Sequence, residues 1–395
     1  MSEWKTIKLK DFVTLKRGYD LPHDKSREGN YPVIASTNIR SYHNEYKVDP
    51  PVVTVGRSGS IGKVQIVNKK AWPLNTTLYV KDSKGNNTNF IYYFLQTMGL
   101  EQFNSGAGVP TLNRNHIGLL KIKIPDIKKQ QKIANVLSTY DKLIENNNRR
   151  IEVLEQTAEE IYKEWFVRMR FPGYENTEFV KGIPEGWEVK KVDDIISFDI
   201  GGGWGKDSPE DDFTEEAHVI RGTDIPIMKY GEINYDLLRF HKESQLRNRR
   251  LQSSDIIFEA SGGSKDQRLG RTYYTTDETL AMYDEDVICA SFCKLIRIDG
   301  KYLSWYFNNY LNYAYKTETL SIFEVQSTGI SNFGFTKFKR HHQILLPSVD
   351  LMKRFFEITY NIYIEKQRLG RKNQILKKQR DLLLPRLMNG TIEVK

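Results

Sequence analysis

A long polar helix predicted near the middle of the chain returns at its C-terminal end, and this repeat constrains the fold more than any other feature. Pro125 opens the first copy and Pro347 the second, so the offset is 347 − 125 = 222 residues. Each copy has a stripe at every seventh position, formed by Ile133, Tyr140, Asn147, Leu154 and Ile161 in the first and by Phe355, Ile362, Leu369, Leu376 and Leu383 in the second. Such a stripe is typical of a coiled-coil seam. We therefore expect the two helices to pair with each other, antiparallel, along these residues.

Asn147 is the one clearly polar member of the first stripe. A single asparagine in a coiled-coil seam commonly fixes the register of pairing at a cost in stability. The alternative interpretation is that Asn147 lies where the pairing loosens. The sequence leaves both interpretations open.

The segments that precede the two helices also resemble each other, which predicts two related globular domains. Trp4–Asp11 is similar to Trp187–Asp194, and Val33–Ile39 is similar to Val219–Ile225. Both segments alternate short β-type runs with turn residues and contain a helix with an aromatic face, which is expected to pack in a core rather than to stack bases. The predicted organisation is globule 1 at 1–125, a central helix at 126–170, a Pro/Gly linker with globule 2 at 171–346, and a C-terminal helix at 347–395.

The expected fold class is α+β, with two α/β domains joined by a long antiparallel two-helix coiled coil and an internal pseudo-twofold repeat. The helices match without a gap while the globules have diverged. A common frame that carries two different binding domains would show this pattern, and such a chain can act as a dimer does on a split DNA target. The C-terminal helix is expected to end near Pro385, because proline interrupts the backbone hydrogen-bond ladder.

The net charge of +9 over 395 residues favours an acidic partner, with nucleic acid as the first candidate. The charge is uneven along the chain. Residues 1–125 carry 18 Lys and Arg against 9 Asp and Glu, whereas residues 171–346 carry 21 against 28. Globule 2 must therefore bind DNA through local basic patches, if it binds DNA.

The two cysteines, Cys289 and Cys293, lack further ligands at metal-site spacing and are expected to be buried structural thiols. Two cysteines in a chain of this length are typical of a reducing cytosol. Because no apolar stretch approaches about 18 residues and the N-terminus lacks the apolar core of a signal peptide, we expect a cytoplasmic protein with no membrane partner.

Loops between β-type runs are the candidate DNA-binding elements, and they recur at the same place in both globules. Gly56–Lys63 combines a guanidinium, hydroxyls and glycines, and Ser261–Arg271 is its counterpart. Arg can pair with guanine, Gln with adenine and Ser with several base edges. A solvated hairpin tip is the alternative for either loop. The candidate residues are Asn38, Arg40, Arg57, Ser58, Ser60, Lys63, Asn113 and Arg114 in globule 1, and Arg221, Asp224, Ser261, Gly263, Lys265, Gln267, Arg268 and Arg271 in globule 2.

No catalytic motif is complete in this sequence. An amino-methyltransferase needs an aromatic residue after its Pro-Pro pair to hold a flipped base, but Asp49-Pro50-Pro51 is followed by Val52. A phosphate-binding P-loop needs Gly six residues before its Lys, and Arg57 stands six residues before Lys63. We therefore expect no catalytic residues, no metal site and no cofactor bound by this chain.

These features together resemble the DNA-specificity subunit of type I restriction-modification systems over essentially the whole chain. The strongest matches are the repeated globule-helix plan, the helix opening at Gln130–Ala134, Ile161–Phe166 followed by Phe171-Pro172-Gly173, the Ile183–Trp187 entry to globule 2, and the closing Leu382–Gly390. The order of all of them is more specific than any single motif.

The resemblance implies that each globule is a target recognition domain that reads one half of a bipartite DNA sequence, and that the paired helices are spacers. It implies double-stranded DNA, two modification (methyltransferase) subunits and the restriction (motor-nuclease) subunits as partners. S-adenosylmethionine, ATP and Mg would be used by those subunits to methylate adenine and to restrict DNA. Two alternatives remain at this stage: a stand-alone DNA-binding regulator with two reading heads, and an enzyme with an unrecognised nucleotide site.

Overall fold

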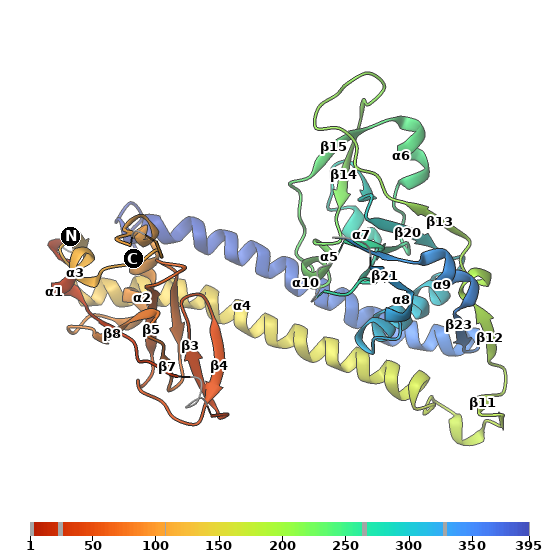
Figure 1. The fold of residues 1–395 in the computed structure, drawn as a ribbon, viewed down its shortest axis with the longest axis horizontal. Coiled ribbons are helices and arrows are strands. Elements are labelled where there is room, and N and C mark those ends of the chain that lie inside the picture. The colour runs from red at the N-terminus through yellow and green to blue at the C-terminus, as the bar shows by residue number, and fades with distance from the viewer. Residues whose placement is uncertain (1–3, 23–26, 107, 263–266, 327–329, 395) are drawn as a thin grey trace. The chain divides into compact units, whose positions relative to one another are not determined.

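The computed structural model describes residues 4–22, 27–106, 108–262, 267–326 and 330–394. Its contacts divide the chain into two compact units, shown with their elements in Figure 1. Unit 1 comprises Met1–Glu145 and Ile375–Lys395, and unit 2 comprises Asn146–Gln374. These boundaries differ from the predicted ones because part of each long helix packs on the globule of its own unit, so that both helices are divided between the units.

In its described residues, unit 1 contains three small sheets, short helices and a part of each long helix. The pair β1·β9 is antiparallel, a four-stranded sheet has the order β2-β8-β5-β6, and a three-stranded sheet has the order β4-β3-β7 with β3 and β7 parallel. Its strands are β1 (Lys5–Lys8), β2 (Thr14–Arg17), β3 (Tyr31–Ile34), β4 (Ile39–His43), β5 (Val52–Gly56), β6 (Val64–Val67), β7 (Trp72–Pro73), β8 (Thr77–Asp82) and β9 (Lys121–Ile124). Its short helices are α1 (Leu9–Phe12), α2 (Thr88–Gln96), η2 (Leu100–Gln102) and α3 (Arg114–Gly118).

Unit 2 repeats this topology with additional elements. Its strands are β10 (Phe179–Val180), β11 (Ile183–Pro184), β12 (Glu188–Lys191), β13 (Phe198–Gly201), β14 (Glu215–Ile220), β15 (Leu238–His241), β16 (Ile256–Glu259), β17 (Ser261–Gly262), β18 (Thr272–Tyr274), β19 (Asp286–Cys289), β20 (Cys293–Arg297), β21 (Glu324–Gln326), β22 (Ser331–Phe333) and β23 (Gln343–Leu346). Its shorter helices are η4 (Tyr174–Asn176), η5 (Val192–Asp194), α5 (Ile225–Met228), α6 (Glu243–Arg249), α7 (Asp277–Leu280), α8 (Lys301–Lys316), η6 (Ser321–Phe323) and α9 (Phe335–His341).

The repeat is complete at the level of strand order. The pair β12·β23 corresponds to β1·β9, the sheet β13-β20-β16-β18 to β2-β8-β5-β6, and the sheet β15-β14-β19 to β4-β3-β7. The parallel pair is also repeated, since β14 and β19 are parallel as β3 and β7 are. The predicted internal repeat of two α/β domains is therefore confirmed.

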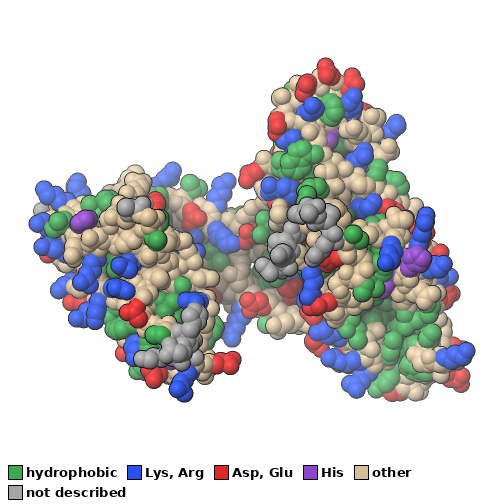
Figure 2. Space-filling view, viewed as in Figure 1, with side chains coloured by type: hydrophobic (Ala, Val, Ile, Leu, Met, Phe, Trp, Pro, Cys, Tyr) green, Lys and Arg blue, Asp and Glu red, His purple; other side chains and the backbone are tan. Residues whose placement is uncertain are grey.

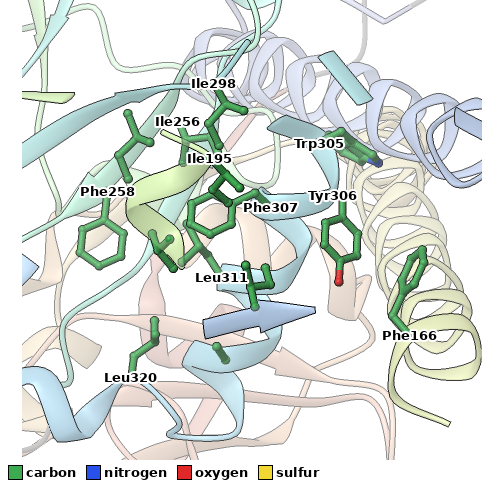
Figure 3. Close-up of a cluster of buried hydrophobic side chains, with 14 of the residues drawn as sticks. Phe166, Ile195, Ile256, Phe258, Ile298, Trp305, Tyr306, Phe307, Leu311 and Leu320 are labelled. Carbon is green, nitrogen blue, oxygen red and sulfur yellow. The ribbon is translucent and has the colours of Figure 1, made fainter. Parts of the chain in front are cut away.

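The aromatic helix α8 supplies the main core of unit 2. Figure 3 shows Phe307 and Leu311 of this helix among Ile256 and Phe258 of β16 and Ile298, which follows β20. All five of these side chains are 5% exposed or less. The aromatic face of α8 thus packs in the core, as predicted, and does not form a base-stacking surface.

The two long helices are α4 (Ile127–Tyr162), which continues as the π-helical turn η3 (Lys163–Val167), and α10 (Val349–Met388). Within unit 1, Asp141 accepts a hydrogen bond from Arg380, and Lys129 pairs with Glu393 beyond the end of α10. The later residue of α4, Asp141, thus lies beside the earlier residue of the C-terminal segment, Arg380. The two segments therefore run antiparallel.

The same antiparallel arrangement holds within unit 2. Asn147 contacts Asn373, Arg150 pairs with Glu365, and the ring of Tyr162 lies 6.0 Å from that of Phe355. The predicted antiparallel helix pair is therefore confirmed. All the predicted seam residues are buried or half-buried, namely Ile133, Tyr140, Asn147, Leu154, Ile161, Phe355, Ile362, Leu369, Leu376 and Leu383.

The C-terminal helix ends two residues beyond the predicted stretch Leu384-Pro385-Arg386, and Pro385 does not interrupt it. Helix α10 continues through Pro385 to Met388, and the amide of Asn389 still donates to the carbonyl of Pro385 at 3.0 Å. Proline removes one backbone donor, and so close to the helix end this costs a single intrahelical hydrogen bond. The chain leaves the helix at Gly390, whose φ of +81° is the left-handed conformation that commonly ends helices.

Both cysteines are buried and unpaired, as predicted. Burial raises the pKa of the Cys289 thiol to about 12, so this sulfur stays protonated and serves packing. Among the described residues, no helix has the length and apolar character needed to cross a lipid bilayer.

Candidate nucleic-acid interface

Unit 1 contains a hollow of about 530 Å³ at the ends of strands β3 and β5. Three of the predicted DNA-binding residues, Arg40, Ser58 and Ser60, line it together with Ser36 and Asn75. The loop after β3 and the loop after β5 are far apart in the sequence, and the sheets bring them to one place. The hollow therefore presents hydroxyl, amide and guanidinium groups, which are the groups that read base edges.

The loop after β5 is held rigidly by its backbone. The amide of Arg57 donates to the carbonyl of Thr76 and its carbonyl accepts from the amide of Leu112, both at 2.8 Å. Ser36 Oγ donates to the carbonyls of Ser58 and Thr76, at 2.9 and 2.8 Å. Gly59 has a φ of +79°, a conformation that favours glycine. Hydrogen bonds to Ser36, Thr76 and Leu112 thus hold the loop in place, which differs from a solvated hairpin tip.

The side chain of Arg57 is half-buried beside this hollow. Its Nη1 donates to the carbonyl of Asn75 at 3.2 Å, which is the one hydrogen bond of this guanidinium within the described part of the chain. Most of its donors therefore stay available to a ligand.

The other candidates of globule 1 are spread more widely. Asn38 and Lys63 are exposed. Asn113 caps helix α3 by accepting a hydrogen bond from the amide of Asn115 at 2.9 Å, so its oxygen has a local structural role. Arg114 is exposed and lines a different hollow.

That different hollow, of about 720 Å³, gathers cations that the sequence analysis missed. Lys10, Lys16 and Lys81 line it together with Arg114, and among the described residues no carboxylate does. These lysines come from β2, β8 and the α1 region, so no local sequence pattern signals their proximity. Such a group suits a phosphate backbone, which attracts cations without regard to sequence.

Unit 2 has a corresponding hollow of about 600 Å³. Arg221 and Gly222 follow β14 here, as the residues Ala35 and Ser36 follow β3 in unit 1, and Ser261 lies after β16 as Ser58 lies after β5. The residues that line it include four predicted ones, Arg221, Ser261, Gln267 and Arg271. Trp204 and Phe292 add aromatic side chains that are 44% and 52% exposed.

Two buried carboxylates hold the arginines of this hollow. Arg221 donates from Nε and Nη2 to Asp224, at 3.0 and 2.9 Å. Arg271 donates from the same two nitrogens to Glu259, at 2.7 and 2.5 Å. Asp224 is 4% exposed and Glu259 is 3% exposed. Bidentate pairs of this kind fix the plane of the guanidinium.

The placement of Asp224 differs from the prediction that it contacts DNA. Both of its oxygens accept hydrogen bonds, from Arg221 and Asn234. Burial by itself would raise the pKa of this carboxyl, but the hydrogen bonds from Arg221 outweigh burial and lower it below its usual value. Asp224 thus stays charged and supports Arg221, and it presents no free oxygen to DNA.

The remaining candidates of globule 2 lie around the rim. Arg268 pairs with Glu318, and both side chains are well exposed. Ser261 Oγ donates to Asn332 Oδ1 at 2.8 Å, because β17 pairs with β22. Asn332 was missed in the sequence, although Thr111 forms a bridge with Ser58 at the matching place in unit 1. Gly263 and Lys265 lie outside the described residues.

The surface charge differs between the units. In Figure 2, Lys and Arg side chains line the edges of the visible face of unit 1 and outnumber Asp and Glu there, whereas Asp and Glu side chains gather at the tip of unit 2. Unit 1 therefore offers a broadly basic surface, and unit 2 offers local arginines held by carboxylates.

The matching family profile and two related proteins all point to specificity subunits of type I restriction enzymes. The profile of the family described as type I restriction modification DNA specificity domain matches residues 1–156. The chain is 25% identical to the type I restriction enzyme MjaIX specificity subunit of Methanocaldococcus jannaschii, over 100% of this chain and 94% of that protein. It is 26% identical to the MjaVIII specificity subunit of the same organism, over 65% of this chain and 63% of that protein.

The fold is also similar to a solved structure. A crystal structure of the S subunit of a type I restriction-modification system from M. genitalium superposes with a TM-score of 0.66 at 17% identity, covering 98% of this chain and 96% of that one. At this level of identity the likeness concerns the fold.

Proposed function

Since this chain belongs to the DNA specificity subunits of type I restriction-modification systems, we propose that its two units read the two halves of a bipartite DNA target. The observation that carries this proposal is the recurrence of one hollow in two units of the same strand order. The two hollows are lined by different side chains. Each unit can therefore recognise its own half-site with a common architecture.

Unit 1 would read through Arg57, Ser58 and Ser60, with Arg40 at the rim. Unit 2 would read through Arg221, Ser261 and Gln267, with Arg271 held in place by Glu259. Side chains that are fixed before binding lose little freedom on binding, which favours specificity. The cations Lys10, Lys16, Lys81 and Arg114 would contact phosphates and contribute affinity without sequence preference.

The chain itself is proposed to be non-catalytic. It lacks a complete base-flipping motif and a P-loop, and its relatives are named as specificity subunits. Adenine methylation and cleavage would be carried out by two modification subunits and by restriction subunits, with S-adenosylmethionine, ATP and Mg bound by those partners. Such a complex would act in the cytoplasm, where its DNA is found. The comparisons do not support the stand-alone regulator.

The direct test is to map methylated adenines in a host that expresses this chain together with its modification subunits. We expect one motif made of two short sequences separated by a fixed unread spacer. A continuous motif would contradict the proposal of two half-sites. The purified chain incubated with labelled S-adenosylmethionine and DNA should transfer no methyl group, and transfer by the chain alone would contradict the non-catalytic role.

A further inference from the structure

Unit 2 contains a second cavity, distinct from the proposed reading hollow, that encloses about 110 Å³. Its walls come from α4, α8, α10, β18 and the end of α5. A buried water needs roughly 10–15 Å³, so this cavity has room for several waters or for one small molecule. The lining is largely aromatic, with Tyr162, Tyr273, Trp305, Tyr313 and Tyr363 among its members.

Two lysines point to the kind of ligand this cavity would take. Lys366 is 8% exposed and, among the described residues, has no hydrogen bond or ion pair. Its ammonium lies 5.6 Å from the ring centre of Tyr230 and 5.8 Å from that of Tyr363. Lys229 donates to Asn312 Oδ1 at 2.5 Å. Neither forms an ion pair in the described part of the chain, although both line the cavity.

The other charged groups around the cavity do not neutralise this pair. Glu159 forms ion pairs with Lys163, at 2.9 Å, and with Lys316, at 2.5 Å. Glu155 lines the cavity and raises the pKa of both lysines, but it pairs with neither. Burial, followed by the nearby charge of Lys366, lowers the pKa of Lys229 to about 7. Burying two like charges without a counterion is costly, so an anion between them would be strongly favoured.

We propose that this cavity is a binding site for a small dianionic oxyanion of the size of sulfate or phosphate, held between the ammonium groups of Lys229 and Lys366. The anion would accept hydrogen bonds from both lysines and neutralise their charges. Residues of α4 between Leu154 and Tyr162, of α10 between Thr359 and Lys366, and of α8 between Trp305 and Lys316 contribute to the lining of the cavity. A bound anion would therefore stabilise the packing of both long helices against the globule of unit 2.

The test is calorimetric titration of the full chain with sulfate, at an ionic strength kept constant with chloride. Sulfate stays doubly charged over the whole pH range, so any pH dependence belongs to the protein. We expect saturable binding of one anion in the wild type. Lys229→Met and Lys366→Met should each weaken binding by about tenfold or more, since each removes a charged hydrogen bond. Lys372→Met, at an exposed position of the same helix, and Arg57→Ala should leave the affinity unchanged.

The pH dependence gives a readout that needs no variant. Sulfate affinity should fall as the pH rises through about 7, because Lys229 then loses its proton. No saturable binding in the wild type would overturn the proposal. So would wild-type affinity in both lysine variants, or binding that stays constant between about pH 6 and about pH 9. Phosphate should compete with sulfate for the one site through its dianion.

Discussion

Asn147 Nδ2 donates a hydrogen bond to Asn373 Oδ1 at 2.8 Å, where the two long helices meet inside unit 2. Both side chains are almost fully buried, with 4% and 2% of their surface exposed. Asn373 Nδ2 in turn donates to Asn148 Oδ1 at 2.8 Å. The helices are therefore in close contact at Asn147, which supports register fixing over a loosened seam.

Replacing one member of this pair should destabilise the protein more than replacing both. Asn147→Leu or Asn373→Leu leaves a buried amide without its partner, at a cost of about 1–3 kcal/mol. The double variant removes both polar groups and should recover much of that loss. Denaturant unfolding of the wild type, the two single variants and the double variant gives the coupling energy between Asn147 and Asn373. Strictly additive effects would show that the two asparagines do not act as a pair.

Arg57→Ala should affect only the first half-site. If the guanidinium contacts a base, binding to the specific site should weaken by about 1–3 kcal/mol and the preference should relax at one position. A phosphate contact would instead weaken binding to all sequences and reduce the salt dependence. Gln267→Ala is the matched variant in unit 2 and should act on the other half-site. A change of preference in both halves by either variant would contradict separate readers.

Glu259→Gln should loosen Arg271 without changing the size of the side chain. The glutamine keeps one acceptor oxygen and loses the charge, so the bidentate contact with Arg271 is broken. We expect weaker discrimination at the second half-site, an unchanged first half-site, and a loss of stability of about 1–3 kcal/mol. Glu318→Gln is the control, since it alters the exposed pair with Arg268 and such pairs contribute little. Equal behaviour of the two variants would show that Arg271 needs no buried partner.

Lys229 should make the stability of the free chain depend on pH. Burial lowers its pKa in the folded state to about 7, against 10.5 for the ordinary side chain. The penalty for burying the charge is fully present below about pH 7 and is relieved as the pH rises towards 10.5, where the unfolded chain also loses the proton. Lys229→Met should therefore raise Tm in chloride buffer more at about pH 6 than at about pH 9.5. An equal gain at both values would show that Lys229 is not titrating.

The helices should set the length of the unread spacer. Inserting four residues after Asn147, with a matching insertion beside Asn373, lengthens both helices by about 6 Å. An insertion of four locally unwinds a coiled coil but keeps the seam. The spacer should lengthen by about one or two base pairs, at about 3.4 Å each, with both half-site sequences unchanged. Mapping the methylated sites of the variant measures the spacer length. An active variant that keeps the original spacer would show that the helices do not set this length.

The sequence by itself determined the elements whose signal is local and periodic. The seven-residue stripe located α4 and α10, and the aromatic face predicted for a helix of globule 2 packs in the core as that of α8. These patterns are visible because burial of one face repeats at a fixed spacing along the chain. The repeated loops after β5 and β16 were also visible, because both copies keep glycine and serine there.

Only the tertiary structure decided which of these loops meet and which charges are already satisfied. Ser36 donates a hydrogen bond to the loop after β5, Lys10 and Lys81 line one hollow, and Asp224 accepts hydrogen bonds from Arg221. The proximity of Lys229 and Lys366 likewise follows from helix packing alone. Such contacts join residues that are distant in the sequence, so they depend on strand order and packing, for which no local pattern carries the information.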